Sequence, residues 1–424
     1  MSLRAATCPE ADIRARARTG TAAAFPEPAE YGTAVFGADP AAPTTDPLDR
    51  LALVPPVFVP RRLAKLVDLG REPVYSDVDL ATTVGGFTST LPLYLSAFGS
   101  TQVASVDLGL AAARQAGALG IPMVVGENVV PVNGYGRVDT DRQRSALARI
   151  TAYAAQLRDG HGGVVVQQST EDADAEVWNL VYSDPNVRSL LESGRLGFEL
   201  KVGQGAKPGL GGLTVLPPAA AARLAEAYTL DDVLGPDAVL RCSSPGTFTA
   251  EILRQQIRLM RNNYPRARIW VKLPPARDVR SAAMVAWDAG ADAVTVDGAE
   301  GGTGWAPTAF LGHVGLPLAE CLRRIGEPPA CLLVSGRMWE GTRVAKALAL
   351  GATAAGLGRA ALLAVDTDAE HGLWRLVECL ALELRMLTSA LGKYQVGELG
   401  SEDLWSPDPT WLLDRAPAET VDVV

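Results

Sequence analysis

The chain has 424 residues, of which 48% are hydrophobic and 21% are charged, and its formal net charge at pH 7 is -9. This composition is typical of a globular protein with a large core, and the length fits either two or three domains or one α/β barrel with an additional arm. The sequence contains no basic run of the nucleic-acid-binding kind, no apolar run of the ~18 residues that cross a membrane, and no signal-peptide pattern. We therefore expect neither a nucleic-acid partner nor a membrane partner. Five cysteines without a CxxC pair indicate a reduced, cytoplasmic protein.

Residues 1–85 predict an irregular N-terminal arm and lead-in. The stretch 26–47 is rich in Pro, Gly, Ala and Thr and has little hydrophobic periodicity, and a proline-rich extended run follows at 54–60. An arm of this kind lies on its own domain or on another subunit, so we expect a homo-oligomer. Residues 401–424 are expected to form a C-terminal tail.

Between residues 86 and 400, short apolar runs alternate with helical patterns. The runs are nearly continuous rather than alternating, which is typical of parallel strands buried on both faces. Eight such strands with helical crossovers predict an α/β fold, a (β/α)8 TIM barrel. A doubly wound sheet is the alternative, but the chain shows no division into two halves. The predicted strands are 91–97, 122–126, 163–167, 198–202, 269–273, 293–296, 331–335 and 354–358.

Glycine and arginine follow the last two predicted strands. Barrel active sites lie at the carboxyl ends of the strands, and the loops after strands seven and eight commonly bind phosphate. Gly336 and Gly358 would expose backbone N–H groups, and Arg337 and Arg359 would add charge-assisted hydrogen bonds. The alternative is that both glycines only make tight turns while both arginines face solvent.

Lys272 stands inside an apolar strand, between Val271 and Leu273. Lysine is seldom buried without a partner, so we expect it to meet an anionic group at the strand end or to form a structural ion pair. Glu127 and Glu300 also follow strands, and paired acids could hold an amino group or move protons. Each acid on its own is more often a loop cap.

A loop with five glycines, within 200–216, follows the fourth strand. Lys201 at the end of this strand, with Gln204 and Lys207 in the loop, offers hydrogen-bond donors to an anion such as a substrate carboxylate. The alternative is a flexible surface loop. The sequence shows no metal-ligand spacing of His, Cys and carboxylate residues, so we expect no metal site.

Three motifs together resemble the FMN-binding synthase domain of glutamate synthases. They are KVGQGAKPG at 201–209, EGGTGWAP at 300–307 and SAFGS at 96–100, and the ends of strands seven and eight are similar as well. The resemblance implies an FMN-binding barrel in which Lys201, Glu127 and Glu300 serve catalysis. In the family, reduced FMN delivers hydride to 2-iminoglutarate, which forms from 2-oxoglutarate and ammonia. The residues that this resemblance assigns to FMN are Ser96, Ala97, Gln168, Lys272, Gly302, Ser335, Gly336, Arg337, Gly358 and Arg359.

The sequence also departs from that family. The family carries three cysteines of an iron–sulfur cluster after strand eight, whereas this region has only Cys379, so we expect no cluster. No glutaminase domain is recognisable. Leu210 replaces a family glutamate and Gln167 a family lysine, so the flavin-facing ends match better than the substrate-facing ends.

We therefore predict an FMN-dependent oxidoreductase that acts on an amino acid, an imino acid or a related carboxylate. Electrons would come from a reductase protein, from NAD(P)H or from the substrate. Two alternatives stay open: another FMN barrel reaction, such as redox-neutral isomerisation or hydroxy-acid oxidation, and an inert subunit of a larger complex.

Overall fold

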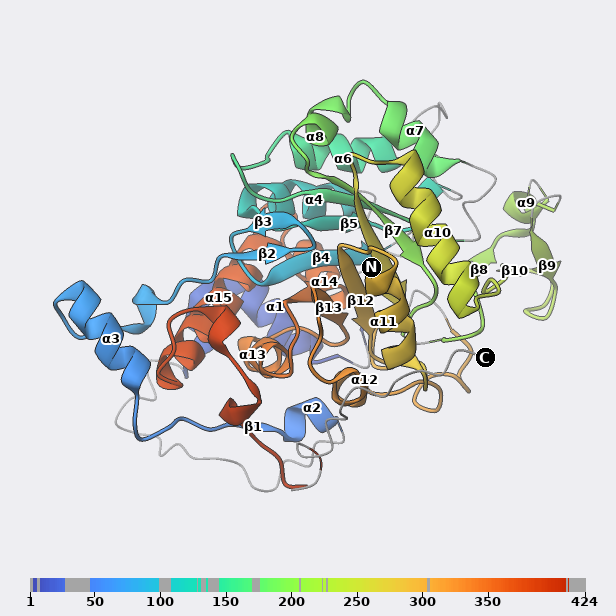
Figure 1. The fold of residues 1–424 in the computed structure, drawn as a ribbon. Helices are drawn as coiled ribbons and strands as arrows, with labels where there is room; N and C mark the ends of the chain where they lie inside the picture. The colour runs from blue at the N-terminus through green and yellow to red at the C-terminus, as the bar shows by residue number, and fades with distance from the viewer. Residues whose placement is uncertain are drawn as a thin grey trace.

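The computed structural model of the chain describes most of its residues (Figure 1). The described residues are 3–5, 8–26, 46–98, 108–127, 129–130, 135, 145–169, 176–205, 207–222, 224–225, 228–302, 306–408 and 411.

Eight parallel strands close into a barrel, which confirms the predicted (β/α)8 fold. Every predicted strand is present, with ends that differ from the prediction by at most two residues. Nearly all strand positions are buried because the barrel interior covers one face and the outer helices cover the other. In their order around the barrel the strands are β4 (Leu93–Phe98), β5 (Met123–Val125), β6 (Val164–Gln168), β7 (Leu196–Lys201), β11 (Arg268–Leu273), β12 (Ala293–Asp297), β13 (Leu332–Ser335) and β14 (Ala354–Leu357).

The crossover helices surround the barrel (Figure 1). Their apolar faces turn inward at helical spacing; in α10, for example, Leu253, Ile257 and Met260 are buried, and the side chain of Thr249 caps the first turn. The helices are α4 (Leu108–Leu119), α6 (Ala146–Ala154), α7 (Val177–Ser183), α8 (Arg188–Glu192), α10 (Ala250–Asn263), α11 (Val279–Asp288), α12 (Leu318–Ile325), α13 (Gly341–Ala349), α14 (Arg359–Thr367) and α15 (Gly372–Ala390).

The amino-terminal end of the barrel is closed by a hairpin of β2 (Thr82–Val84) and β3 (Phe87–Ser89). The indole of Trp270 inside the barrel lies 5.8 Å from the Phe87 ring, centroid to centroid, and its Nε1–H donates to the Gly85 carbonyl oxygen at 2.9 Å. Any side chain at Gly85 would collide with this indole, and the backbone there has φ of +55°. This apolar end leaves the opposite end of the barrel for polar groups.

The segment expected to be an irregular arm includes three helices within its described residues. In α1 (Glu10–Thr19), Ile13 and Ala17 are buried against α14 and α15. A short α2 (Pro47–Arg50) precedes β1 (Ala52–Leu53), which pairs antiparallel with β15 (Leu404–Trp405) from the end of the chain. Helix α3 (Pro60–Leu69) follows, and Figure 1 shows it standing away from the barrel.

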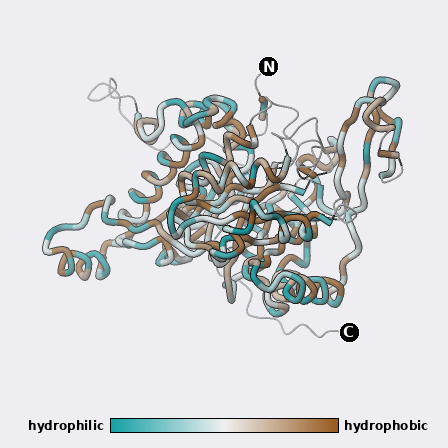
Figure 2. Tube along the Cα trace, turned by 90° about the horizontal axis from the view of Figure 1, so that it is seen from above, coloured by the Kyte–Doolittle hydropathy of each residue, from teal (hydrophilic) through white to brown (hydrophobic). Residues whose placement is uncertain are grey.

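A small antiparallel sheet was not expected from the sequence. It consists of β8 (Leu213–Leu216), β9 (Thr229–Asp231) and β10 (Val239–Cys242), with α9 (Pro218–Ala221) between β8 and β9. The sheet and α3 project from opposite sides of the molecule in both views (Figures 1 and 2). Within the described residues, no helix combines the length and the apolar character that a membrane crossing requires.

Candidate active site at the carboxyl end of the barrel

Asp297 joins three of the predicted strand ends. It is the last residue of β12, with Lys272 on one neighbouring strand and Ser335 on the other. Ser335 Oγ donates to Asp297 Oδ1 at 2.7 Å, and the Gly205 backbone N–H donates to Oδ2 at 2.9 Å. Lys272 Nζ lies 3.5 Å from the same Oδ2. Asp297 therefore holds the glycine-rich loop, Lys272 and the end of β13 around one barrel mouth.

Lys272 is a buried cation. Burial alone would lower its pKa, but the carboxylates of Asp297 and Glu199 hold the pKa of Lys272 above its ordinary value. Both interpretations of this lysine drawn from the sequence thus apply in part, since it forms an ion pair and also lies at the strand end.

Glu199 is a buried acid that the sequence analysis missed. It lies inside the barrel on β7, where it accepts hydrogen bonds from Gln167 Nε2 and, at 2.9 Å, from Thr295 Oγ1. Burial raises the pKa of Glu199 above its ordinary value. The available signal was a charged residue two positions before Lys201 in an apolar strand, because residues two apart point to the same side of a strand.

Lys201 lies with Glu127 and Gln204. Its ammonium group donates to Glu127 Oε1 and, at 2.8 Å, to Gln204 Oε1. Burial would raise the pKa of Glu127, but the charge of Lys201 outweighs it and holds that pKa below its ordinary value. Lys207 is also buried, so neither lysine is a freely exposed loop residue. A pocket here is lined by Ser169, Lys201, Val202, Gly203, Gln204, Lys207, Gly209, Gly211, Gly212, Ser243, Ser244 and Pro245.

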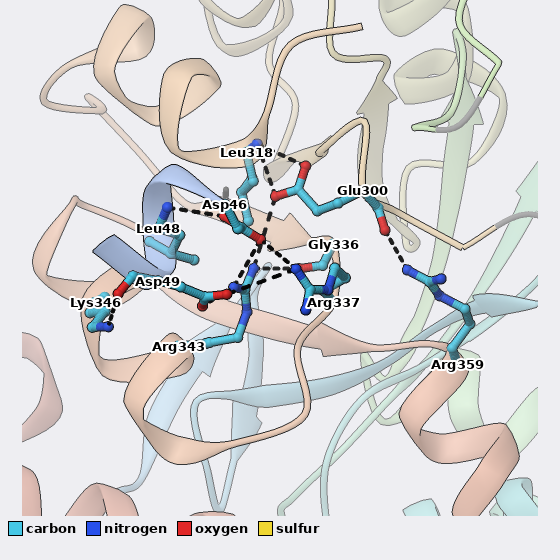
Figure 3. Close-up of polar contacts among 10 residues, drawn as sticks. All are labelled: Asp46, Leu48, Asp49, Glu300, Leu318, Gly336, Arg337, Arg343, Lys346 and Arg359. Carbon is cyan, nitrogen blue, oxygen red and sulfur yellow. Dashed lines mark hydrogen bonds and ion pairs between the residues drawn. The ribbon is translucent and has the colours of Figure 1, made fainter. Parts of the chain in front are cut away.

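The loop after β13 has an unusual backbone at Gly336 and Arg337, with φ of +140° and +51°. Arg337 Nη1 lies 3.1 Å from Asp46 Oδ2, so the guanidinium is fixed by a residue that precedes α2 (Figure 3). Its Nε is buried and has no hydrogen-bond partner within the described part of the chain. A buried donor without a partner is costly, which is consistent with a place for an anion.

Gly358 caps the amino-terminal end of α14, where partial positive charge favours anions. A Cβ at Gly358 would meet no atom within 4 Å, so open space lies beside this backbone. Arg359 donates from Nη2 to the carbonyl oxygen of Glu300 (Figure 3). A Cβ at Gly302 would lie 3.0 Å from Arg359 Cγ. The ends of β13 and β14 thus present the donors expected of a phosphate site.

Arg343 on α13 was not considered in the sequence analysis. Its fully buried side chain lies 3.0 Å from Asp46 Oδ2 through Nη1, pairs with Asp49 and donates from Nη2 to the Gly336 carbonyl oxygen at 3.4 Å (Figure 3). Lys346 Nζ also donates to the Asp49 carbonyl oxygen, at 3.2 Å. Two aspartates at the start of α2 therefore neutralise the basic residues beside the loop that follows β13.

Glu300 does not share the cluster that contains Glu127. Both of its carboxylate oxygens accept from the Leu318 backbone N–H at 3.1 Å, at the start of α12, and Oε1 lies 3.9 Å from Arg343 Nη2. Burial, aided by the nearby charge of Asp46, raises the pKa of Glu300 to about 7. This position fits a helix-terminal acid better than a partner of the substrate pocket.

The other residues assigned to the cofactor also occupy strand ends. Ser96 is buried and Ala97 half-buried at the end of β4, and Gln168 is half-buried at the end of β6. Three parts of the recognised motifs, 99–100, 206 and 303–305, lie outside the described residues. Cys379 is buried on α15, with Arg16 Nη1 3.1 Å from its sulfur.

The chain is thus a (β/α)8 barrel whose carboxyl end gathers lysines, arginines and glycines from several strand ends. Residues 135–371, more than half of the chain, match a family model described as "Conserved region in glutamate synthase". The chain belongs to this family, and the resemblance inferred from its motifs is confirmed.

Among curated proteins the chain is similar to an archaeal-type glutamate synthase (NADPH) of Dehalococcoides mccartyi, with 31% identity over 242 residues that cover 54% of this chain and 47% of the relative. It is also similar to a glutamate synthase large subunit-like protein of Rhizobium meliloti, with 33% identity over 244 residues that cover 54% of this chain and 53% of the relative. The chain therefore spans about half the length of these relatives.

Two solved structures share the fold. An (S)-mandelate dehydrogenase variant superposes with a TM-score of 0.56 at 19% identity, covering 85% of this chain and 88% of that chain. A flavocytochrome b2 variant with benzoylformate superposes with a TM-score of 0.56 at 18% identity, covering 88% of this chain and 80% of that chain. At these identities the likeness concerns the fold alone.

Proposed function

We propose that the chain is an FMN-dependent oxidoreductase of the glutamate synthase family that acts on an amino acid, an imino acid or a related small carboxylate. The observation that carries this proposal is the network around Asp297, which joins Lys272, the glycine-rich loop and the end of β13 in one barrel mouth. Similarity to glutamate synthases supports the family reaction, and the barrel offers one mouth for both the cofactor and the substrate.

The residues at the ends of β13 and β14 fit the phosphate of FMN. Open space beside Gly358 adjoins a helix amino terminus, and the buried Nε of Arg337 offers a donor. Lys272 would contact the flavin ring, where its charge favours the reduced, anionic form. Bound FMN would supply hydride transfer.

The substrate would enter the pocket beside Lys201. In this proposal Lys201, Gln204 and Lys207 bind its carboxylate through charge-assisted hydrogen bonds. Glu127 stays ionised beside Lys201, so its carboxylate can accept a hydrogen bond from an amino or imino N–H and orient that group.

Electron supply is a separate part of the proposal. One relative bears NADPH in its name, so a reductase protein or NAD(P)H is the expected donor, and a cytoplasmic location would give access to both. Two measurements test the function. Purified protein should show a flavin absorption spectrum, and chemically reduced protein should convert 2-oxoglutarate and ammonia to glutamate. A coloured protein that forms no glutamate would leave the cofactor assignment intact and remove glutamate synthesis, whereas a colourless protein would support an inert subunit.

Replacing Gly358 with alanine is expected to weaken FMN binding about tenfold or more, because the methyl group would occupy the space proposed for the phosphate. The free energy of unfolding without FMN should change little, since the new Cβ meets no protein atom within 4 Å. Titration of flavin-free protein with FMN gives the affinity. Gly397, which also has open space but lies far along the chain in a 3-10 turn, provides the matched control as Gly397→Ala. Equal affinities for the two variants would contradict the assigned phosphate site.

A further inference from the structure

Glu199 is a buried titratable group to which the proposed function gives no role. Its side chain lies inside the barrel, and the residue is only 1% exposed. Lys201, two residues further along β7, pairs in register with Lys272 on β11. Since residues two apart point to the same side of a strand, Glu199 lies one level of side chains below Lys272, on the way to the apolar end of the barrel.

The hydrogen-bond partners of Glu199 can accommodate both of its protonation states. Gln167 Nε2 donates to Oε2, and Thr295 Oγ1 donates to Oε1 at 2.9 Å, so both oxygens of the ionised carboxylate have a neutral donor. A threonine hydroxyl can also accept a hydrogen bond. When Glu199 is protonated, its own O–H can therefore donate to Thr295 Oγ1, while Gln167 continues to donate to the other oxygen.

Asp297 and Glu127 lie close by but are bound to lysines, which can only donate. Lys272 Nζ lies 3.5 Å from Asp297 Oδ2, and the ammonium group of Lys201 donates to Glu127 Oε1. The charge of Lys201 holds the pKa of Glu127 below its ordinary value, whereas burial raises the pKa of Glu199. Among these three acids, Glu199 is therefore the one that most readily binds a proton.

Lys272 couples Glu199 to the barrel mouth. The carboxylates of Asp297 and Glu199 together hold the pKa of Lys272 above its ordinary value. The other titratable groups whose charges act on this pair are Glu127, which follows β5, and Tyr94 on β4, and burial raises the pKa of Tyr94 so that it stays neutral. A further negative charge beside Lys272 would disfavour the ionised form of Glu199, because like charges repel in a buried site.

On the basis of the proposed function, we propose that Glu199 takes up a proton when the flavin beside Lys272 is reduced, and that this proton makes the reduction potential steeply dependent on pH. Two electrons and one proton convert FMN to its reduced, anionic form, which adds one negative charge. A second proton from solvent converts the Glu199 carboxylate to the carboxylic acid and cancels that charge. Glu199 is then a positioning residue that acts through Lys272.

The reduction potential of the flavin-loaded protein, measured between about pH 5 and pH 9, tests the proposal. One proton per two electrons gives a slope of about 30 mV per pH unit, and two protons give about 59 mV. The natural chain should show the steeper slope between the pKa values of Glu199 in the oxidised and the reduced protein. Glu199→Gln cannot ionise and should keep the shallower slope throughout. Equal slopes for the two proteins would overturn the proposal.

Glu340→Gln is the matched control, because burial also raises the pKa of this half-buried acid at the start of α13. This variant should keep the steeper segment. Thr295→Val removes a hydrogen bond that favours ionised Glu199, so the steeper segment should move to higher pH by about one unit. An unmoved segment would overturn the proposal even if Glu199→Gln failed to fold.

Infrared difference spectra of the reduced and oxidised protein give an independent result. Reduction of the natural chain should produce a carboxylic acid C=O band that is missing from Glu199→Gln. A protein that holds flavin but gains no such band would overturn the role of Glu199 and leave the proposed function intact. A colourless protein would remove both.

Discussion

Replacing Lys272 with methionine is expected to lower the free energy of unfolding by about 3–5 kcal/mol, because removing one partner of a buried ion pair leaves the other charge uncompensated. Asp297 would lose the cation 3.5 Å away, and Glu199 would lose the charge that opposes the effect of its burial. Methionine keeps most of the volume of the side chain, so the loss reports on charge rather than on a cavity. Urea unfolding near neutral pH, followed by tryptophan fluorescence, measures this loss in the free energy of unfolding.

Two further variants show whether the ion pair is the cause. Adding Asp297→Asn to Lys272→Met should restore part of the stability, since the uncompensated carboxylate is then gone. Lys346→Met is the control, because Lys346 is half-buried and its ammonium group donates to a backbone carbonyl oxygen, that of Asp49. If Lys272→Met and Lys346→Met lose equal stability, the loss in Lys272→Met does not come from breaking the ion pair with Asp297.

The barrel could be predicted because each of its strands can be recognised from its own few residues. Continuous apolar runs such as 293–296 are bounded by glycine or polar residues, and parallel strands buried on both faces need that pattern. Strand ends of a barrel converge at one edge, so the meeting of Lys272, Ser335 and the glycine-rich loop followed from the fold. The fold alone did not predict in which direction each of these side chains points.

The acids that pair with Arg337 and Arg343 could not be predicted from local patterns. Asp46 and Asp49 lie in a segment without periodicity, and only the folded chain carries them to Arg343, almost three hundred residues further along. Their signal in the sequence is an ordinary helix start, since Asp46 caps α2 through the Leu48 backbone N–H at 3.0 Å. Neither segment has a local sequence pattern from which these long-range ion pairs could be predicted.

The raised pKa of Glu300 is expected to lower the free energy of unfolding as the pH rises. Its pKa is about 7 in the folded chain against an ordinary value of 4.5, because burial and then the charge of Asp46 disfavour the ionised form. The folded state therefore keeps a proton that the unfolded state releases. The stabilisation is fully present below pH 4.5 and is lost as the pH rises through about 7. The Glu300 side chain is only 14% exposed, and at 1.36 kcal/mol per pKa unit the loss amounts to about 3 kcal/mol.

Comparison with Glu300→Gln isolates this titration from those of other groups. Glutamine can still accept the hydrogen bond from the Leu318 backbone but does not ionise, so the variant should gain about 3 kcal/mol relative to the natural chain between about pH 4.5 and pH 8. Glu320→Gln on the same helix α12 is the control. Hydrogen bonding to Arg323 lowers the pKa of Glu320, so the stabilisation of the fold by ionised Glu320 is lost only as the pH falls below about 4.5. The difference in the free energy of unfolding between Glu320→Gln and the natural chain should therefore stay constant above about pH 5. Urea unfolding of the three proteins across this range gives both differences. A constant difference between Glu300→Gln and the natural chain would mean that burial and the charge of Asp46 do not raise the pKa of Glu300.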